Sequence, residues 1–138
     1  MKVFVDTNIV IDLLSKRKGH YESAAALFSK ADRSELEISV SARTIANTQY
    51  ILSKYGNKAD ALNVLRRFKV LVEVAPLDEK IISLALSQDR FTDFEDSLQY
   101  YSALETDSLV IITRNTRDFK PSQLPVMQPD EFLAKYYS

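Results

Sequence analysis

Short, continuous apolar runs alternate along the chain with longer segments in which apolar residues recur at helical spacing. The clearest run is 109–113, LVIIT, which shows no alternation with polar residues. A run of this kind is typical of a strand covered on both faces. We expect strands at 2–5, 37–40, 70–74, 109–113 and 125–127, and helices at 8–15, 21–31, 41–55, 58–68, 78–87, 97–105 and 129–137.

Strands separated by helices predict a parallel sheet with helices on both of its faces. The fold class we predict is α/β: a three-layer α/β/α fold with a central, mainly parallel sheet. With 138 residues and no linker or repeat, the range 1–138 is expected to form a single domain. In such sheets, ligands bind just outside the carboxyl ends of the strands.

Composition narrows the possible chemistry. The chain has no cysteine, which excludes disulfides and thiolate metal sites, and one histidine, His20, which excludes a zinc site built on imidazoles. No apolar run reaches the roughly 18 residues of a membrane helix, and the N-terminus lacks a secretory signal pattern. We therefore expect a cytoplasmic protein with no membrane partner. The net charge of −1 provides no global basic field for nucleic acid, so any such contact must come from local patches.

Carboxylates and amides gather near the expected ligand-binding edge in three places. Asp6 and Asn8 directly follow the first predicted strand. The run 92–96, TDFED, precedes a predicted helix, and the run 113–119, TRNTRDF, follows the most apolar strand. Asp93 and Asp96 are three residues apart, so they share one face if they lie on a helix.

Each of the three places also has a purely structural explanation. Asp or Asn after a strand commonly caps the next helix. Thr92 and Glu95 match a capping box, and Asp93 could cap the same helix. Asn115 and Asp118 suit a turn, because their side chains bond the local backbone.

Convergence of these acids would require a counter-charge. At an effective dielectric near 20, two carboxylates in close contact repel by about 4 kcal/mol, and a whole domain is stable by only about 5–15 kcal/mol. Either some carboxylates are protonated or a cation lies among them. With oxygen ligands alone, that cation would be hard, Mg²⁺ or Mn²⁺, which suits phosphoryl chemistry.

Three motifs together resemble the PIN domain family: VFVDTN at the start, DFEDSLQYYSAL in the second half, and VIITRNTRDF before a final helix. The resemblance covers the whole chain and is strongest to the branch with Asp-x-Asn and Thr-Arg-Asn-x-x-Asp-Phe. It implies an α/β/α nuclease that binds Mg²⁺ or Mn²⁺ and cuts RNA. Many small bacterial and archaeal members are toxins of toxin–antitoxin pairs.

The resemblance also implies roles for single residues. Asp6, Asp96 and Asp118 match metal-binding acids, with Asp118 bound through water. Asp93, in the same catalytic group, would be either an additional ligand or a residue that orients the ligands. Residues expected to orient ligands or water are Asn8, Asn47, Thr113 and Asn115. Arg114 and Arg117 lie beside this set in sequence and could hold RNA phosphates by charge-assisted hydrogen bonds.

Asn47 departs from the family pattern, which usually places Glu in the helix after the second strand. An amide is a neutral and weaker ligand, so the site loses one negative charge. Asn47 either orients a metal-bound water or is simply a polar helix residue. The departure leaves a second interpretation open, a catalytically decayed module that binds RNA or protein. A third, an aspartyl-phosphate phosphatase with Asp6 as nucleophile, usually needs a second Asp where this chain has Asn8.

The expected partners follow from the same resemblance. They are an RNA substrate, a small antitoxin whose C-terminal segment masks the acidic pocket, and a second copy of the chain in a homodimer. The aromatic residues Phe132, Tyr136 and Tyr137 near the C-terminus suit either a dimer interface or the core.

Overall fold

A computed structural model describes residues 1–137 of the chain. Its centre is a five-stranded sheet with strand order β3-β2-β1-β4-β5, in which every neighbouring pair is parallel. The predicted α/β class with a parallel sheet is therefore confirmed. The strands are β1 (Lys2–Val5), β2 (Glu37–Ser41), β3 (Val72–Ala75), β4 (Val110–Ile112) and β5 (Val126–Met127).

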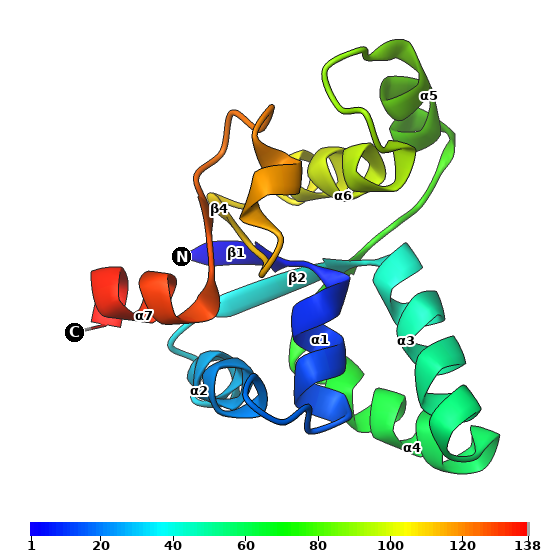
Figure 1. The fold of residues 1–138 in the computed structure, drawn as a ribbon, viewed down its shortest axis with the longest axis vertical. Helices are drawn as coiled ribbons and strands as arrows, with labels where there is room; N and C mark the ends of the chain where they lie inside the picture. The colour runs from blue at the N-terminus through cyan, green and yellow to red at the C-terminus, as the bar shows by residue number, and fades with distance from the viewer. Residues whose placement is uncertain (138) are drawn as a thin grey trace.

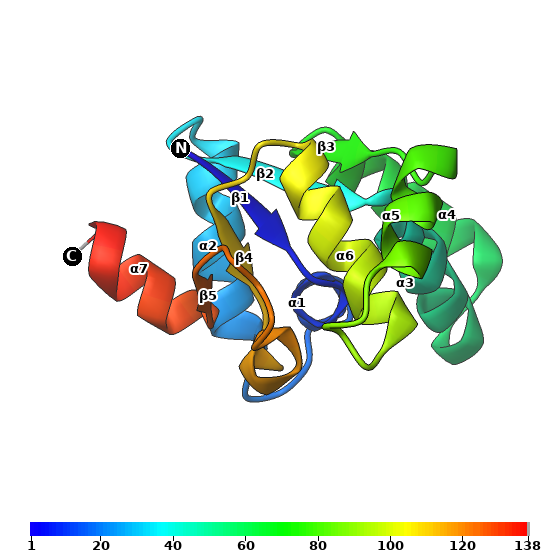
Figure 2. The same cartoon turned by 90° about the horizontal axis from the view of Figure 1, so that it is seen from above.

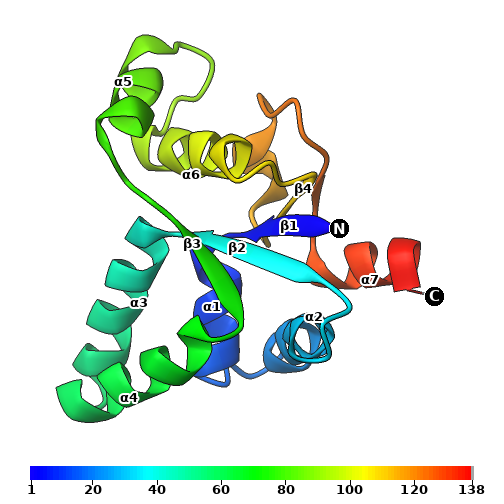
Figure 3. The same ribbon diagram turned by 180° about the vertical axis from the view of Figure 1, so that it is seen from behind.

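Helices cover both faces of this sheet. They are α1 (Thr7–Leu14), α2 (Tyr21–Asp32), α3 (Ala42–Tyr55), α4 (Lys58–Lys69), α5 (Glu79–Ser87), α6 (Phe94–Glu105), the 3₁₀ helix η1 (Thr116–Phe119) and α7 (Pro129–Tyr137). Figure 1 shows α5 and α6 on one side of the sheet and α1, α2 and α7 on the other. Seen from behind, α3 and α4 pack against each other below β3 (Figure 3). Among residues 1–137, no helix combines the length and apolar character needed to cross a bilayer.

The core explains why the strands read as unbroken apolar runs. Successive residues of a strand point to opposite faces. Val3 and Val5 of β1 belong to the core cluster that includes residues of α1, α2 and α7, whereas Phe4 packs with Tyr100 and Ala103 of α6 on the other face. All three β1 residues are fully buried, so both faces of the strand must be apolar.

Two element boundaries differ from the prediction by two or more residues. Helix α6 begins at Phe94 and not at Ser97, because the Asp93 carboxylate caps it by accepting the backbone N–H groups of Glu95 and Asp96. Strand β3 begins at Val72 and not at Val70, because the preceding residues still bond to carbonyls of α4. The short helix η1, which covers the motif after β4, was not predicted.

The aromatic C-terminus mainly serves the core. Phe132 is fully buried in the cluster of α1, α2 and α7, and Tyr137 packs against that cluster and donates its hydroxyl to the Glu35 carbonyl. Of the three aromatic residues, only Tyr136 is exposed. The core interpretation of Phe132 and Tyr137 is therefore the correct one, and a dimer interface at this end would have to rest on Tyr136.

Strand register brings three polar side chains into a row at the carboxyl edge of the sheet. Val5 of β1 pairs with Ile112 of β4, and the Asp6 backbone N–H continues this ladder to the Ile112 carbonyl. Asp6 and Thr113, the next residue on each strand, are therefore neighbours. Ser41 ends β2 on the other side of β1 (Figure 2). The candidate site is built around this row.

Candidate active site

Asp6 is held by three hydrogen bonds at the start of α1. Its Oδ1 accepts the backbone N–H of Thr7 at 2.8 Å and the side-chain amide of Gln99 at 2.9 Å, and its Oδ2 accepts the Thr113 hydroxyl at 2.8 Å. The residue is only 8% exposed. Asp6 therefore both caps α1, one of the explanations left open by the sequence, and presents an oriented carboxylate at the edge of the sheet.

The direction of the Thr113 hydroxyl is fixed by its other partners. Thr113 Oγ1 accepts the Asn8 side-chain amide at 3.2 Å and the Asn115 backbone N–H at 3.1 Å, so its single proton is directed to Asp6. Asn8 does not bond to a carboxylate itself. It acts on Asp6 only through Thr113, and its Oδ1 accepts the Arg114 backbone N–H at 3.3 Å.

Gln99 has a central place in this network that the sequence analysis missed. It lies on α6, is 1% exposed, and donates its Nε2 to Asp6 and to the Thr44 hydroxyl. Ser41 sets the direction of this amide. Ser41 Oγ caps α3 by accepting the Thr44 N–H, which leaves its proton to bind Gln99 Oε1 at 2.5 Å. The only sequence signal was the spacing of Gln99 three residues after Asp96, on the same face of the helix.

A hollow of about 260 Å³ lies in front of Asp6, and the acids and amides singled out from distant parts of the sequence line it together. They come from the start of α1, from α3, from the start of α6 and from the loop after β4. The lining residues that matter to the chemistry are Asp6, Asn8, Asn47, Asp93, Asp96 and Asn115. Asp118 is exposed and lines an adjoining hollow, which shares Asn115 with the first.

The electrostatics of Asp96 show how closely these charges interact. Burial raises the pKa of the Asp96 carboxyl from 3.8 to about 7, and the charges of Asp93, Asp6 and Asp118 add to that rise, while Arg43 opposes it. Asp96 therefore keeps its proton to a much higher pH than an ordinary aspartate does. The acids do converge electrostatically, and a proton on Asp96 relieves part of their repulsion.

The donor set fits a hard divalent cation, because every candidate ligand offers oxygen from a carboxylate or an amide. Among residues 1–137, however, no three acidic or histidine side chains stand close enough to form a ready metal-binding group. The carboxylates surround the hollow without closing on a common point. A bound divalent cation would neutralise the charge of these carboxylates more completely than the single proton on Asp96 does.

Asp93 and Asn47 both line the hollow but differ in their exposure to solvent. Asp93 is exposed and uses its Oδ1 to cap α6, so its predicted capping and its place at the site coexist. Asn47 is half-buried on α3 and faces the same hollow as Asp6 and Asp96. Asn47 therefore lines the hollow together with the acids.

Arg114 has a different partner from the one suggested by its sequence neighbours. Its guanidinium binds the Asp12 carboxylate with two hydrogen bonds, of 2.7 and 3.1 Å. Asp12 is 1% exposed and also pairs with Arg17 at 3.4 Å, and a buried charge of this kind requires such partners. Arg114 therefore ties the loop after β4 to α1. Arg117 remains exposed.

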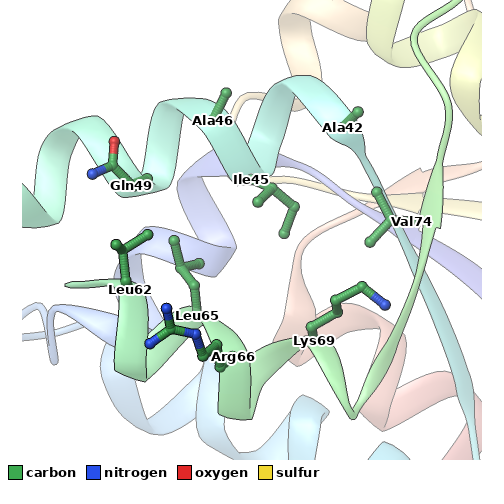
Figure 4. Close-up of a pocket in the computed structure, with 9 residues that line it drawn as sticks. All are labelled: Ala42, Ile45, Ala46, Gln49, Leu62, Leu65, Arg66, Lys69 and Val74. Carbon is green, nitrogen blue, oxygen red and sulfur yellow. The ribbon is translucent and has the colours of Figure 1, made fainter. Parts of the chain in front are cut away.

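A second hollow, of about 520 Å³, lies between α3, α4 and β3 (Figure 4). Apolar side chains such as Ile45, Leu62 and Leu65 line most of it, with Arg66 and Lys69 on the α4 side. None of its lining residues is an acid or a histidine. This groove cannot supply the chemistry that the first hollow offers.

Comparison with known proteins agrees with this architecture. The sequence model of the PIN domain family matches residues 2–117, and the chain belongs to that family. It is 27% identical over 139 aligned positions to ribonuclease VapC1 of Aquifex aeolicus, covering 98% of this chain and 95% of the relative.

Two solved structures share the fold at lower identity. VapBC-1 from nontypeable Haemophilus influenzae has a TM-score of 0.69 at 19% identity, covering 94% of this chain and 99% of that one. A toxin–antitoxin complex from Klebsiella pneumoniae has a TM-score of 0.68 at 23% identity, covering 92% and 97%.

Proposed function

We propose that this protein is an endoribonuclease that depends on Mg²⁺ or Mn²⁺ and hydrolyses RNA phosphodiester bonds. The observation that carries the proposal is that Asp6, Asp93 and Asp96 line one hollow at the carboxyl edge of the sheet, where burial and the neighbouring carboxylates raise the pKa of Asp96. Membership of the PIN family and the similarity to a protein named as a ribonuclease support the choice of RNA.

The residues around the hollow have different proposed roles in this reaction. Asp6, Asp93 and Asp96 would hold the cation, which would polarise the phosphodiester and lower the pKa of a water when bound. Gln99 and Thr113 keep the Asp6 carboxylate turned to the hollow. Asp118, beside the hollow, orients the attacking water and accepts its proton.

The amides complete the proposed site. Asn47 orients a water at the position where the family usually has Glu, and this neutral ligand lowers the affinity for the cation relative to an acid. Asn115 and Asn8 hold the Thr113 hydroxyl in register with Asp6. Arg117 is exposed near Asp118 and contacts the RNA backbone.

Incubation of the protein with mixed RNA, with and without Mn²⁺, tests the proposal. The wild type should degrade RNA only with Mn²⁺, and Asp6→Asn should not degrade it. Uncut RNA under every condition, together with measurable RNA binding, would favour the decayed binding module. That rival is supported by Asn47 and by the absence of a ready three-acid group among residues 1–137.

The phosphatase alternative has less support. Both oxygens of Asp6 already accept hydrogen bonds, and the second acid that such enzymes usually have is Asn8 here. The phosphatase alternative would require a phosphoryl group that is stable in acid to be detected on Asp6 after incubation with a phosphoryl donor.

We further propose that the protein acts as the toxin of a toxin–antitoxin pair. A structural relative is described as a toxin–antitoxin complex, and the partner expected here is a small antitoxin with a segment that covers the acidic hollow. Expression of the chain alone should arrest growth, and Asp6→Asn should remove the arrest. The same resemblance leads us to expect a homodimer, which sedimentation would detect.

A further inference from the structure

Two cations line the acidic hollow alongside the carboxylates, Arg17 and Arg43. Arg17 is paired with the buried Asp12. Arg43 lies in the first turn of α3 and reaches across to α6, where its Nη2 lies 2.5 Å from Glu95 Oε2. The hollow is thus bridged by an ion pair between the two helices that carry Asn47 and Asp96.

The Arg43–Glu95 pair is asymmetric. The Arg43 side chain is 20% exposed, whereas the Glu95 side chain is 64% exposed. Pairs with so exposed a partner contribute little to stability, because water screens the attraction and both side chains lose freedom. The Arg43–Glu95 pair is therefore expected to contribute little to the stability of the fold. A guanidinium held by a solvent-exposed carboxylate can exchange that carboxylate for another anion.

RNA is the anion that must approach this hollow if the proposed function holds. Its backbone meets an acidic surface there, so it needs a local positive charge close to the carboxylates. Arg114 does not offer one, because it does not line this hollow and its guanidinium is held by the buried Asp12. Arg43 faces the hollow itself and offers a planar fork that matches two phosphate oxygens.

We propose that Arg43 binds a phosphate of the RNA strand next to the bond that is cut, and that Glu95 holds Arg43 in place until this phosphate displaces it. The proposal rests on the function proposed above and adds a substrate contact to the same site. It requires no change in the backbone, because only the partner of the guanidinium changes.

Exchange of partners predicts opposite effects for the two members of the pair. Arg43→Gln removes the phosphate contact and should weaken RNA binding by about tenfold, the range of a hydrogen bond to a charged group. Glu95→Gln removes the competitor and should strengthen binding several-fold. If the pair only fastened α3 to α6, both variants would weaken binding together.

The test is fluorescence anisotropy of a labelled single-stranded RNA, measured with the full chain in Ca²⁺, a hard cation that neutralises the carboxylates. The salt dependence of binding should be smaller by about 0.7 in slope for Arg43→Gln, the value for one phosphate contact on a single strand. Arg67→Gln, an exposed arginine at the end of α4, controls for general loss of positive charge. Glu105→Gln, paired with Lys80 at the far end of α6, controls for general loss of negative charge.

The double variant completes the design. In the Arg43→Gln background, Glu95→Gln should no longer strengthen binding beyond the Glu105→Gln control, because no guanidinium remains to be released. Equal binding and equal salt slopes for wild type and Arg43→Gln, with both folded by circular dichroism, would overturn the proposal. If the wild type hydrolyses RNA in Mn²⁺ at the same time, only this inference falls. If it neither binds nor cuts RNA, the proposed function falls with it.

Discussion

Gln99 Nε2 donates a hydrogen bond of 2.9 Å to Asp6 Oδ1 across 93 positions of sequence. The amide can donate there because Ser41 binds its oxygen end, and Ser41 is directed by the cap it forms on α3. The orientation of a proposed metal ligand on β1 is thus coupled to the start of a helix on the other side of the hollow. Gln99 acts through Asp6 and is a positioning residue.

Gln99→Met should test this coupling with little change in volume. Without the amide, Asp6 loses one of its three hydrogen bonds, and Mn²⁺ affinity should fall by about 10- to 100-fold, as for other residues that orient metal ligands. Calorimetric titration measures the affinity. Gln49→Met, on α3 with a local bond to Ser53, is the matched control and should bind Mn²⁺ as the wild type does. Equal affinities for the two variants would contradict the coupling.

Asp96 should make metal-free stability depend on pH. Its pKa is about 7 in the folded chain and 3.8 as the reference, so between about pH 4 and pH 7 the folded state binds a proton that the unfolded state lacks. Stability should therefore decrease as pH rises through this window, by well under the full value of about 1.4 kcal/mol per pH unit, because water screens this half-buried carboxyl.

Asp96→Asn should remove that dependence. In EDTA at pH 8 the variant should be more stable to urea than the wild type, because it carries no charge beside Asp93 and Asp6. The two proteins should be close at pH 5, where Asp96 is largely protonated. A variant less stable than the wild type at pH 8 would mean that ionised Asp96 stabilises the fold.

Asp12→Asn should destabilise the protein without touching the hollow directly. Asp12 is almost fully buried and binds Arg114 with two hydrogen bonds, so its loss leaves a guanidinium without its counter-charge. The cost should be about 3 kcal/mol, measured by urea denaturation. Glu105→Gln breaks an exposed pair with Lys80 and should leave the denaturation midpoint near that of the wild type. A midpoint for Asp12→Asn equal to that control would refute the structural role.

Asn47→Glu should restore the acid that the family usually has. Asn47 faces the hollow, so a carboxylate there adds one charge for a cation, and Mn²⁺ affinity should rise by on the order of tenfold. Metal-free stability should fall, because a further like charge joins Asp96. Unchanged Mn²⁺ affinity would show that position 47 lies outside the metal's reach.

Local patterns sufficed for most of the fold. The apolar runs at β1 and β4 predicted buried strands because strands covered on both faces have no polar alternation. Their order with helices between them then implied the parallel sheet. The start of α6 was placed three residues too late because the run 88–96, QDRFTDFED, is polar and resembles a turn, although its Asp93 caps the helix.

The charged residues of the candidate site could be predicted from the sequence, whereas the neutral residues that orient them could not. Asp6 and Asp96 stand out because carboxylates beside apolar elements are costly. Gln99 is a neutral amide on a helix. The neighbouring sequence does not distinguish a buried residue with several hydrogen bonds from a surface residue. The Asp12–Arg114 pair joins residues 102 positions apart and was not predicted, because no local pattern links the two residues.

Calorimetric titration with Mn²⁺ at pH 6 and pH 8 tests the central claim most directly, that these carboxylates need a divalent cation. We predict binding that is weaker at pH 6 and releases a proton there, since Mn²⁺ must displace the proton of Asp96, and loss of binding in Asp6→Asn. Heats that are absent at both pH values, or identical in the wild type and Asp6→Asn, would contradict it.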